Sequence, residues 1–300
     1  MDGFRPIPGR IIKVLRGKMK IPGNSRALVK FDTLEKEDVV VKSVSLEDLD
    51  RLSLQIQKQI DYIPSHGIRT PRVISRCINS GRFEVVMEFV RGLDFVSFTN
   101  TASAEEFERV VSKLIFAVQS HFKSATLENF PIQVWTKKVQ SLSSAALQKS
   151  IDQSLVSKME RFLVESAPEK ILMGPCHGDL TFSNVIVERD GAVCVFDFLD
   201  PPIDTPVEDV SKLLQDAEFY WTLRKFSGDC DRTRVQIMWS HARKMILQEF
   251  LGIISQRDLA VFQVMTLARI IPYTSDQDVI DYLVKCIMRK INETDLTMRR

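Results

Sequence analysis

The chain has 300 residues, of which 44% are hydrophobic and 27% are charged, and its formal net charge is +2. This composition is ordinary for a globular protein with one large domain or two lobes, and it excludes a disordered or low-complexity chain. The near balance of charge gives no argument for a nucleic-acid partner or a membrane surface, although the first 30 residues hold eight Lys or Arg and one acid.

The cysteines indicate the compartment. The five of them are far apart and form no CxxC motif or Cys/His cluster, so we expect free thiols in a reducing cytoplasm. The opening segment MDGFRPIPGR has no apolar signal core, and no apolar run approaches the about 20 residues that span a bilayer. We therefore expect a cytoplasmic protein with no membrane partner.

The first part of the chain predicts a small sheet and one helix. A helix is expected over residues 45–63, because apolar residues recur along one face after a capping box of Ser45 and Asp48. Two strands before it enclose a loop flanked by Gly17 and Gly23, which has no GxGxxG motif. The strands are expected at 10–17, 26–31, 37–42, 72–77 and 82–90, the last two joined through a turn at 79–81.

The rest of the chain reads as mostly helical. Ser103 and Glu106 form a second capping box before a long apolar stripe, and Thr205 caps a helix that has Pro206 at its first position. Helical periodicity predicts further helices at 136–149, 152–165, 231–251, 257–271 and 276–292.

A hairpin interrupts these helices. Apolar runs at 185–187 and 192–196 flank Asp190-Gly191, the dipeptide that favours a two-residue turn with both φ angles positive. With these two residues as the loop, Asn184 lies directly opposite Asp197, at about 5 Å between Cβ atoms. An amide oxygen beside a carboxylate suits a hard cation such as Mg²⁺, so Asn184 and Asp197 are the predicted metal ligands.

Asp179 lies five residues before Asn184, in the loop that leads into the hairpin. A carboxylate beside a nucleotide-bound magnesium ion can orient a substrate hydroxyl and accept its proton. We predict Asp179 as the catalytic base. His177 is expected to hold the loop by hydrogen bonding.

These motifs support a resemblance. HGDLTFSN followed by VFDFLD resembles the aminoglycoside phosphotransferase and choline kinase superfamily, which are small-molecule relatives of the protein kinases. The resemblance implies a bilobal α/β (α+β) fold, with an antiparallel N-lobe sheet plus one helix over residues 1–91 and a mostly helical C-lobe over 92–300. It also implies ATP or GTP as phosphoryl donor, with Mg²⁺.

The resemblance also assigns roles to individual residues. Lys42, at the end of Val39-Val40-Val41, corresponds to the strand lysine that steadies the nucleotide phosphates. The backbone of Glu88, Phe89 and Val90 corresponds to the hinge that binds adenine. Asp209 matches an aspartate that braces the catalytic loop.

The predicted C-helix departs from the family pattern. It offers Gln55, Gln57 and Gln59 where a glutamate normally pairs with the lysine, with Glu47 as a possible substitute near the helix start.

The predicted function is transfer of the γ-phosphoryl group of ATP or GTP to a hydroxyl of a small substrate. A sugar, an aminoglycoside, a choline-like amine and an amino-acid alcohol all remain open as acceptors, with a preference for a sugar-type hydroxyl. A nucleotide-binding pseudokinase or regulatory scaffold is the alternative from another class. A protein kinase is disfavoured because HGD replaces HRD and no APE-type segment follows. The oligomeric state stays unknown.

Overall fold

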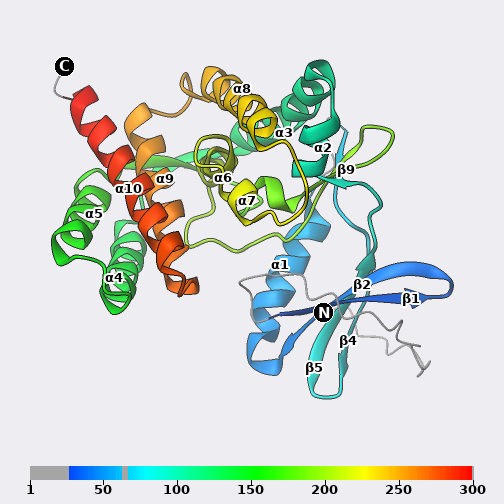
Figure 1. The fold of residues 1–300 in the computed structure, drawn as a ribbon. Helices are drawn as coiled ribbons and strands as arrows, with labels where there is room; N and C mark the ends of the chain where they lie inside the picture. Colours follow the sequence, from blue (N-terminus) through cyan, green and yellow to red (C-terminus); the bar gives the residue numbers. More distant parts are fainter. Residues whose placement is uncertain (1–26, 63–66, 299–300) are drawn as a thin grey trace.

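The computed structural model describes residues 27–62 and 67–298, and for residues 297–298 only the backbone. Three sequence predictions fall outside this range: the strand at 10–17, the loop flanked by Gly17 and Gly23, and most of the basic segment of the first 30 residues. Of that basic segment, only residues 27–30 are described. Figure 1 shows an N-terminal sheet with one helix beside a larger helical part. This is the predicted bilobal α/β class; the boundary at residue 91 stays a prediction.

The N-terminal sheet is antiparallel with strand order β1-β2-β5-β4. Its strands are β1 (Leu28–Leu34), β2 (Glu37–Ser45), β4 (Val73–Asn79) and β5 (Arg82–Glu88). The predicted turn between β4 and β5 is present, with positive φ at Ser80 and Gly81. The strands thus form where β-branched and aromatic residues alternate between turn residues.

Helix α1 (Leu49–Asp61) covers one face of this sheet. Leu52 and Ile56 of α1 pack against Phe83 and Val85 of β5 in a buried cluster. The helix starts later than predicted, because residues 46–48 form a 3₁₀ turn, and Ser45 makes no capping bond to the backbone. Lys42 lies opposite Val85 in the β2–β5 register, so it shares this face with α1.

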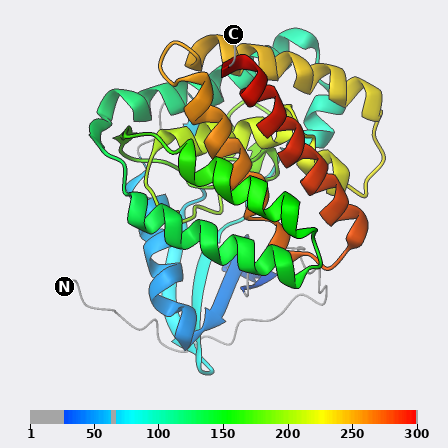
Figure 2. The ribbon, with the colours of Figure 1, turned by 90° about the vertical axis from the view of Figure 1, so that its left-hand side faces the viewer.

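The larger part is built from helices around α6 (Figures 1 and 2). Every residue of α6 is buried, and α6 packs against α8 and α9. The helices are α2 (Phe95–Thr101), α3 (Ala104–Ser124), α4 (Ile132–Gln148), α5 (Gln153–Glu165), α6 (Pro206–Ala217), α7 (Trp221–Lys225), α8 (Arg232–Phe250), α9 (Gln256–Ala268) and α10 (Gln277–Met298), with a 3₁₀ turn at Ile271–Tyr273.

Most of the predicted helices are confirmed, and so is the Ser103–Glu106 capping box. Two short helices, α2 and α7, were not predicted, because seven and five residues are too few for a periodic apolar stripe. Among the described residues, no helix has the length and apolar character needed to cross a membrane.

Two small sheets complete the fold. One has the order β3-β10-β9-β6 and contains the predicted hairpin; the other pairs β7 with β8. Their strands are β3 (Ile68–Arg69), β6 (Leu93–Asp94), β7 (Thr126–Asn129), β8 (Lys170–Met173), β9 (Val185–Val187) and β10 (Val193–Val195). Figure 1 shows β9 beside α2, at the edge of the helical part.

Phe83→Ala tests the packing of α1 on the sheet. Phe83 is 1% exposed, so its truncation should lower the free energy of unfolding by about 3–5 kcal/mol, measured by urea denaturation. Ile78→Ala on the neighbouring strand is the control, because Ile78 is 60% exposed and its loss should change stability by no more than about 0.5 kcal/mol. Equal effects of the two changes would contradict the buried cluster.

Candidate functional site

The loop before the hairpin is held by a buried carboxylate. Asp209 of α6 is fully buried and accepts hydrogen bonds from the N–H groups of His177 (2.8 Å) and Gly178 (2.9 Å). These are the bracing contacts predicted for Asp209. Because the two donors belong to the residues just before Asp179, Asp209 fixes the direction in which the chain enters the site.

His177 also holds the loop, as predicted. Its ring Nε2 lies 3.0 Å from the carbonyl oxygen of Phe196, and its Nδ1 accepts the N–H of Asp179 at 3.2 Å. These contacts place the ring proton on Nε2. Burial lowers the pKa of His177, so the imidazole is neutral at pH 7. It connects the backbone of Phe196 to the backbone of Asp179 through its two ring nitrogens.

Gly178 satisfies a steric requirement of the same loop. Its φ is +82°, and a Cβ atom at this position would lie 2.6 Å from the carbonyl oxygen of Leu199. No side chain fits in that conformation and space. The glycine of the HGD motif therefore allows the loop to approach the segment after Asp197.

Asp179 and Asn184 are in direct contact. The side-chain Nδ2 of Asn184 donates to the backbone oxygen of Asp179 at 2.8 Å and to its Oδ2 at 3.0 Å. Two acceptors on the same side fix the orientation of the amide. The oxygen of the Asn184 side chain is then the atom available to a cation.

A lysine of α6 also pairs with Asp179. The Nζ of Lys212 lies 3.0 Å from Oδ1 of Asp179, and the lysine side chain is 7% exposed. Burial acts to raise the pKa of Asp179, but the positive charge of Lys212, with a smaller contribution from Arg269, lowers it overall. Asp179 is therefore ionised at neutral pH and able to accept a proton.

The hairpin register differs from the prediction by one residue. Val185 pairs with Val195, and Glu188 donates its N–H to Ala192, so the loop has three residues, Arg189 to Gly191. Only Gly191 has a positive φ; the loop is the three-residue type with glycine in the left-handed position, not the two-residue type. The prediction that Asn184 faces Asp197 directly was therefore wrong.

Asn184 instead faces the residue before Asp197. Its backbone oxygen accepts the N–H of Phe196 at 3.2 Å. Asp197 then adopts a positive φ of 64°, which is unusual for a residue with a side chain and redirects its carboxylate. The carboxylate lies 2.5 Å from the Nζ of Lys42. Lys42 and Asp197, which are 155 residues apart in the sequence, thus meet at the site.

Gln57 and Gln59 of the predicted C-helix have partners other than Lys42. Gln57 bonds to Asp61 of its own helix, and Gln59 donates to the carbonyl oxygen of Pro71. The partner that the structure gives Lys42 is Asp197. Glu47 is exposed at the 3₁₀ turn before α1.

A contact that the sequence did not predict ties α1 to the helical part. Lys58 reaches Asp204 at 2.6 Å and the carbonyl oxygen of Leu199 at 3.2 Å. Burial acts to lower the pKa of Lys58, but its interactions with Cys176 and Asp204 outweigh burial and raise the pKa. The lysine therefore stays charged and bridges the two parts of the molecule.

The predicted hinge is held by ion pairs. Arg69 lies between Glu88 (2.9 Å) and Glu188 of the hairpin (2.6 Å). The N–H groups of Glu88 and Phe89 donate to the carbonyl oxygens of Arg72 and Asp38. The backbone N–H groups of Glu88 and Phe89 are therefore already hydrogen-bonded within the protein. Contact between adenine and the backbone of Glu88, Phe89 and Val90 stays a prediction.

Asp216, one helical turn beyond Lys212, supports the other end of the loop. It is fully buried and accepts the N–H of Phe182 at 2.7 Å and that of Thr222 at 2.6 Å. Burial raises the pKa of Asp216 to about 6. Neither Lys212 nor Asp216 was predicted, although their spacing of three and seven residues from Asp209 places all three on one helical face.

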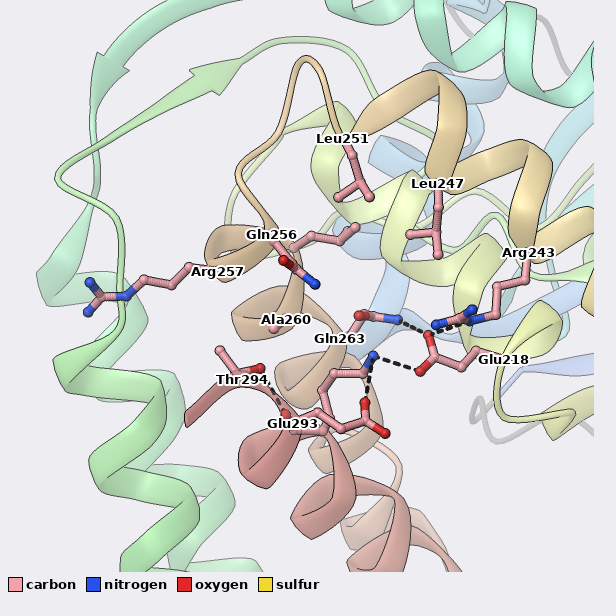
Figure 3. Close-up of a pocket in the computed structure, with 12 residues that line it drawn as sticks. Glu218, Arg243, Leu247, Leu251, Gln256, Arg257, Ala260, Gln263, Glu293 and Thr294 are labelled. Atoms are coloured by element: carbon pink, nitrogen blue, oxygen red, sulfur yellow. Dashed lines mark hydrogen bonds and ion pairs between the residues drawn. The ribbon is translucent and has the colours of Figure 1, made fainter. Parts of the chain in front are cut away.

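The end of α6 is fixed by a separate charge cluster. Figure 3 shows Glu218, just beyond α6, beside a cavity of about 270 Å³ between α8, α9 and α10. Its carboxylate lies 2.6 Å from the Nζ of Lys290 and accepts a hydrogen bond from Gln263 at 3.0 Å. None of the predicted site residues lines this cavity. We therefore assign the cluster to anchoring α6.

Comparison with known proteins identifies the family. The model of the phosphotransferase enzyme family matches residues 20–235, which is more than half of the chain and includes Lys42, Asp179, Asn184 and Asp197. The chain belongs to the phosphotransferase enzyme family. None of the curated proteins compared with this phosphotransferase matches it at a significant level.

Solved structures share the fold of this phosphotransferase at low sequence identity. A thermostable mutant of the aminoglycoside phosphotransferase APH(4)-Ia is similar to it with a TM-score of 0.64 and 11% identity, over 92% of this chain and 94% of that one. A ternary complex of that enzyme with ADP and hygromycin B gives 0.61 and 11%, over 91% and 92%. The choline kinase LicA from Streptococcus pneumoniae gives 0.57 and 13%, over 91% and 92%.

Asp209→Ala tests the bracing of the catalytic loop. Its loss leaves two buried N–H groups without an acceptor, and each such group costs about 1–3 kcal/mol. The free energy of unfolding should therefore fall by several kcal/mol. In native-state hydrogen exchange, the amides of His177 and Gly178 should lose protection. Asp200→Ala, at an exposed position in the same segment, should leave both amides protected. Unchanged protection in the Asp209 variant would contradict this role.

Proposed function

We propose that this protein is a small-molecule kinase that transfers the γ-phosphoryl group of ATP, or of GTP, to a hydroxyl of a small substrate. The observation that carries the proposal is the convergence of two pairs, Asp179 with Asn184 and Lys42 with Asp197. The hydrogen bond from the N–H of Phe196, the neighbour of Asp197, to the backbone oxygen of Asn184 joins the two pairs. The ADP complex of the similar aminoglycoside phosphotransferase supports a nucleotide as donor.

In the proposed reaction, the substrate hydroxyl oxygen forms a bond to the γ-phosphorus. The bond from that phosphorus to the βγ-bridging oxygen breaks, and its electron pair leaves on the nucleoside diphosphate. The hydroxyl proton passes to the carboxylate of Asp179 and then to solvent. Lys42 steadies the α- and β-phosphates, so positioning and charge neutralisation supply most of the catalysis.

Asn184 and Asp197 are the residues that would hold magnesium. The amide orientation supports this, because the Asn184 nitrogen is used by Asp179 and an oxygen remains for a hard cation. Across the described residues, no group of three or more His, Cys, Asp or Glu forms a metal cluster. Two protein oxygens supplemented by phosphate and water are what Mg²⁺ ordinarily uses; when bound, it would neutralise charge on the phosphates.

A pseudokinase or regulatory scaffold is the second candidate. The observation in its favour is that the predicted C-helix has glutamines where the family pattern has a glutamate to pair with Lys42. Against it stands the closed set of contacts around Asp179, which a scaffold has no need of.

For the kinase function, a sugar-type hydroxyl remains the preferred acceptor group. We also propose that the protein works in a reducing cytoplasm, where its five cysteines stay free thiols.

Asp179→Asn tests the catalytic base. The asparagine keeps the size of the side chain but cannot accept the proton, so kcat should fall by about 100-fold or more while nucleotide binding persists. The measurement is steady-state phosphoryl transfer, with nucleotide affinity from titration calorimetry. Unchanged turnover would remove Asp179 as the base.

Asp197→Ala tests the nucleotide and metal site. In a thermal shift assay with ATP or GTP, wild-type protein should gain stability when magnesium is present, because the ligand binds the folded state. The variant should lose most of this gain. The control is Asp200→Ala, three residues away and exposed, which should retain it. A wild-type protein that shows no shift with either nucleotide at millimolar concentration would favour the scaffold.

A further inference from the structure

Two lysines of the N-terminal part hold the segment that follows the hairpin. The Nζ of Lys42, on strand β2, lies 2.5 Å from the carboxylate of Asp197. The Nζ of Lys58, on helix α1, donates a hydrogen bond to the backbone oxygen of Leu199 at 3.2 Å. The two contacts are two residues apart in the segment 197–199, and the sheet and the helix that supply them pack together.

Phe198, between these two residues, makes two ring contacts. Its ring packs edge-on against Tyr62, the residue after α1, with 5.3 Å between the ring centroids. It also stacks on the ring of His177, with 4.1 Å between the centroids. Phe198 is buried, so both contacts lie in the interior. The segment 197–199 thus has a buried aromatic centre and a lysine contact at each end.

Lys58 has two further partners, which come from other segments. Its Nζ lies 2.6 Å from Oδ1 of Asp204 and 3.6 Å from the Sγ of Cys176. The thiol of Cys176 in turn donates to Oδ1 of Asp204 at 3.3 Å. Cys176 directly precedes the HGD motif, and Asp204 directly precedes Thr205, the N-cap of α6. One ammonium group therefore joins α1 to the catalytic loop, to the segment 197–199 and to the start of α6.

Leu199 passes the contact of Lys58 to the loop that carries Asp179. Its N–H donates to the backbone oxygen of His177 at 3.0 Å. Its own oxygen lies against Gly178, where a Cβ atom would come within 2.6 Å of it. Because the two backbones touch at this point, a displacement of Leu199 displaces the residues just before Asp179.

The two lysines differ in what the proposed reaction requires of them. Lys42 is assigned to the nucleotide phosphates and Asp197 to magnesium, so their ion pair has to open when the nucleotide binds. The partners of Lys58 have no such second role, and its contacts can persist through the reaction. In the family pattern a glutamate of α1 would pair with Lys42, and this helix has glutamines at the expected positions. The contacts of Lys58 then connect α1 to the site in its place.

We propose that Lys58 is a positioning residue of the phosphoryl-transfer site: it holds α1 against Leu199 and thereby fixes the direction of Asp179. This rests on the proposed kinase function. The ion pair with Asp204 alone would contribute little, because the side chain of Asp204 is 50% exposed. The charge-assisted hydrogen bond to the Leu199 oxygen carries the coupling. Lys58 touches neither nucleotide nor acceptor in this arrangement, so it acts on the rate of transfer rather than on nucleotide affinity.

Hydrogen exchange of the full chain tests the coupling. Lys58→Met keeps the apolar stem of the side chain and removes the ammonium. The amides of His177, Gly178 and Leu199 should then exchange about tenfold faster, with and without MgATP, because the loop opens more readily. The amides of α8, outside the segments that Lys58 joins, should change by less than about twofold. Equal acceleration in α8 would mean a general loss of stability and would overturn the proposal.

The effect on the reaction is followed as ADP formation from MgATP with water as acceptor, which requires no identified substrate. Lys58→Met should lower kcat by about tenfold and change KM for ATP by less than about threefold. Lys58→Arg should restore most of kcat, because it keeps the positive charge and the N–H donors. Gln57→Met is the matched control. Gln57 is the exposed neighbour on α1 and bonds to Asp61 of the same helix, so neither constant should change.

Asp204→Asn tests whether the partners act together. The amide removes the negative charge and keeps the backbone oxygen, which accepts the N–H of Gly174 at 3.0 Å. This variant alone should lower kcat less than Lys58→Met does. Combined with Lys58→Met it should cost nothing further, because the contact is already lost. Losses that add up would contradict a shared contact.

The outcomes for Lys58 and for the kinase function are separable. Unchanged exchange or unchanged kcat in Lys58→Met, beside an active wild-type protein, would overturn the positioning role and leave the kinase function intact. A wild-type protein that binds MgATP without hydrolysing it is judged by hydrogen exchange, where the variant should lose the protection that MgATP gives to Leu199. Absence of magnesium-dependent nucleotide binding would remove the proposed function and the positioning role with it.

Discussion

The arrangement of the site depends on one buried carboxylate. Asp209 is fully buried and accepts hydrogen bonds from two backbone N–H groups of the residues before Asp179. Without such an acceptor, these donors would be buried and unsatisfied, and the loop would relax toward water. The position of Asp179 is thus set by a helix that lies behind the loop.

That helix, α6, acts as a frame for the whole site. Along its length it supplies Asp209 to the start of the loop, Lys212 to Asp179 and Asp216 to the end of the loop. The polar groups are tolerated inside because each has a partner. Glu218, beyond the last turn, ties the same helix to α9 and α10 through Gln263 and Lys290. Packing on three sides therefore leaves α6 little freedom to move.

The sequence predicted the parts of the molecule that depend on local pattern. The strands of the first sheet, the capped helices and the HGD loop all follow from periodicity, turn residues or a motif confined to a few positions. The register of the hairpin did not, because Asp190-Gly191 fits both a two-residue loop and a three-residue loop, and only the φ of Asp190 distinguishes them. Contacts such as Lys58 with Asp204, 146 residues apart, have no local signal.

The three-residue loop of the hairpin limits how this chain can vary. The length of that loop decides which face of the sheet each side chain of β10 takes, and Asp197 lies two residues after the end of β10. A loop shortened by one residue keeps the pairing only if it can close as a two-residue turn with the φ angles that such a turn needs. Otherwise the pairing shifts by one position and the side chains of β10 turn toward the opposite face. Amino-acid exchanges at Arg189 and Asp190 leave this length intact, whereas insertions and deletions change it. During divergence, the length of the hairpin tip is therefore more constrained than the identity of Arg189, while the positive φ of Gly191 continues to require glycine.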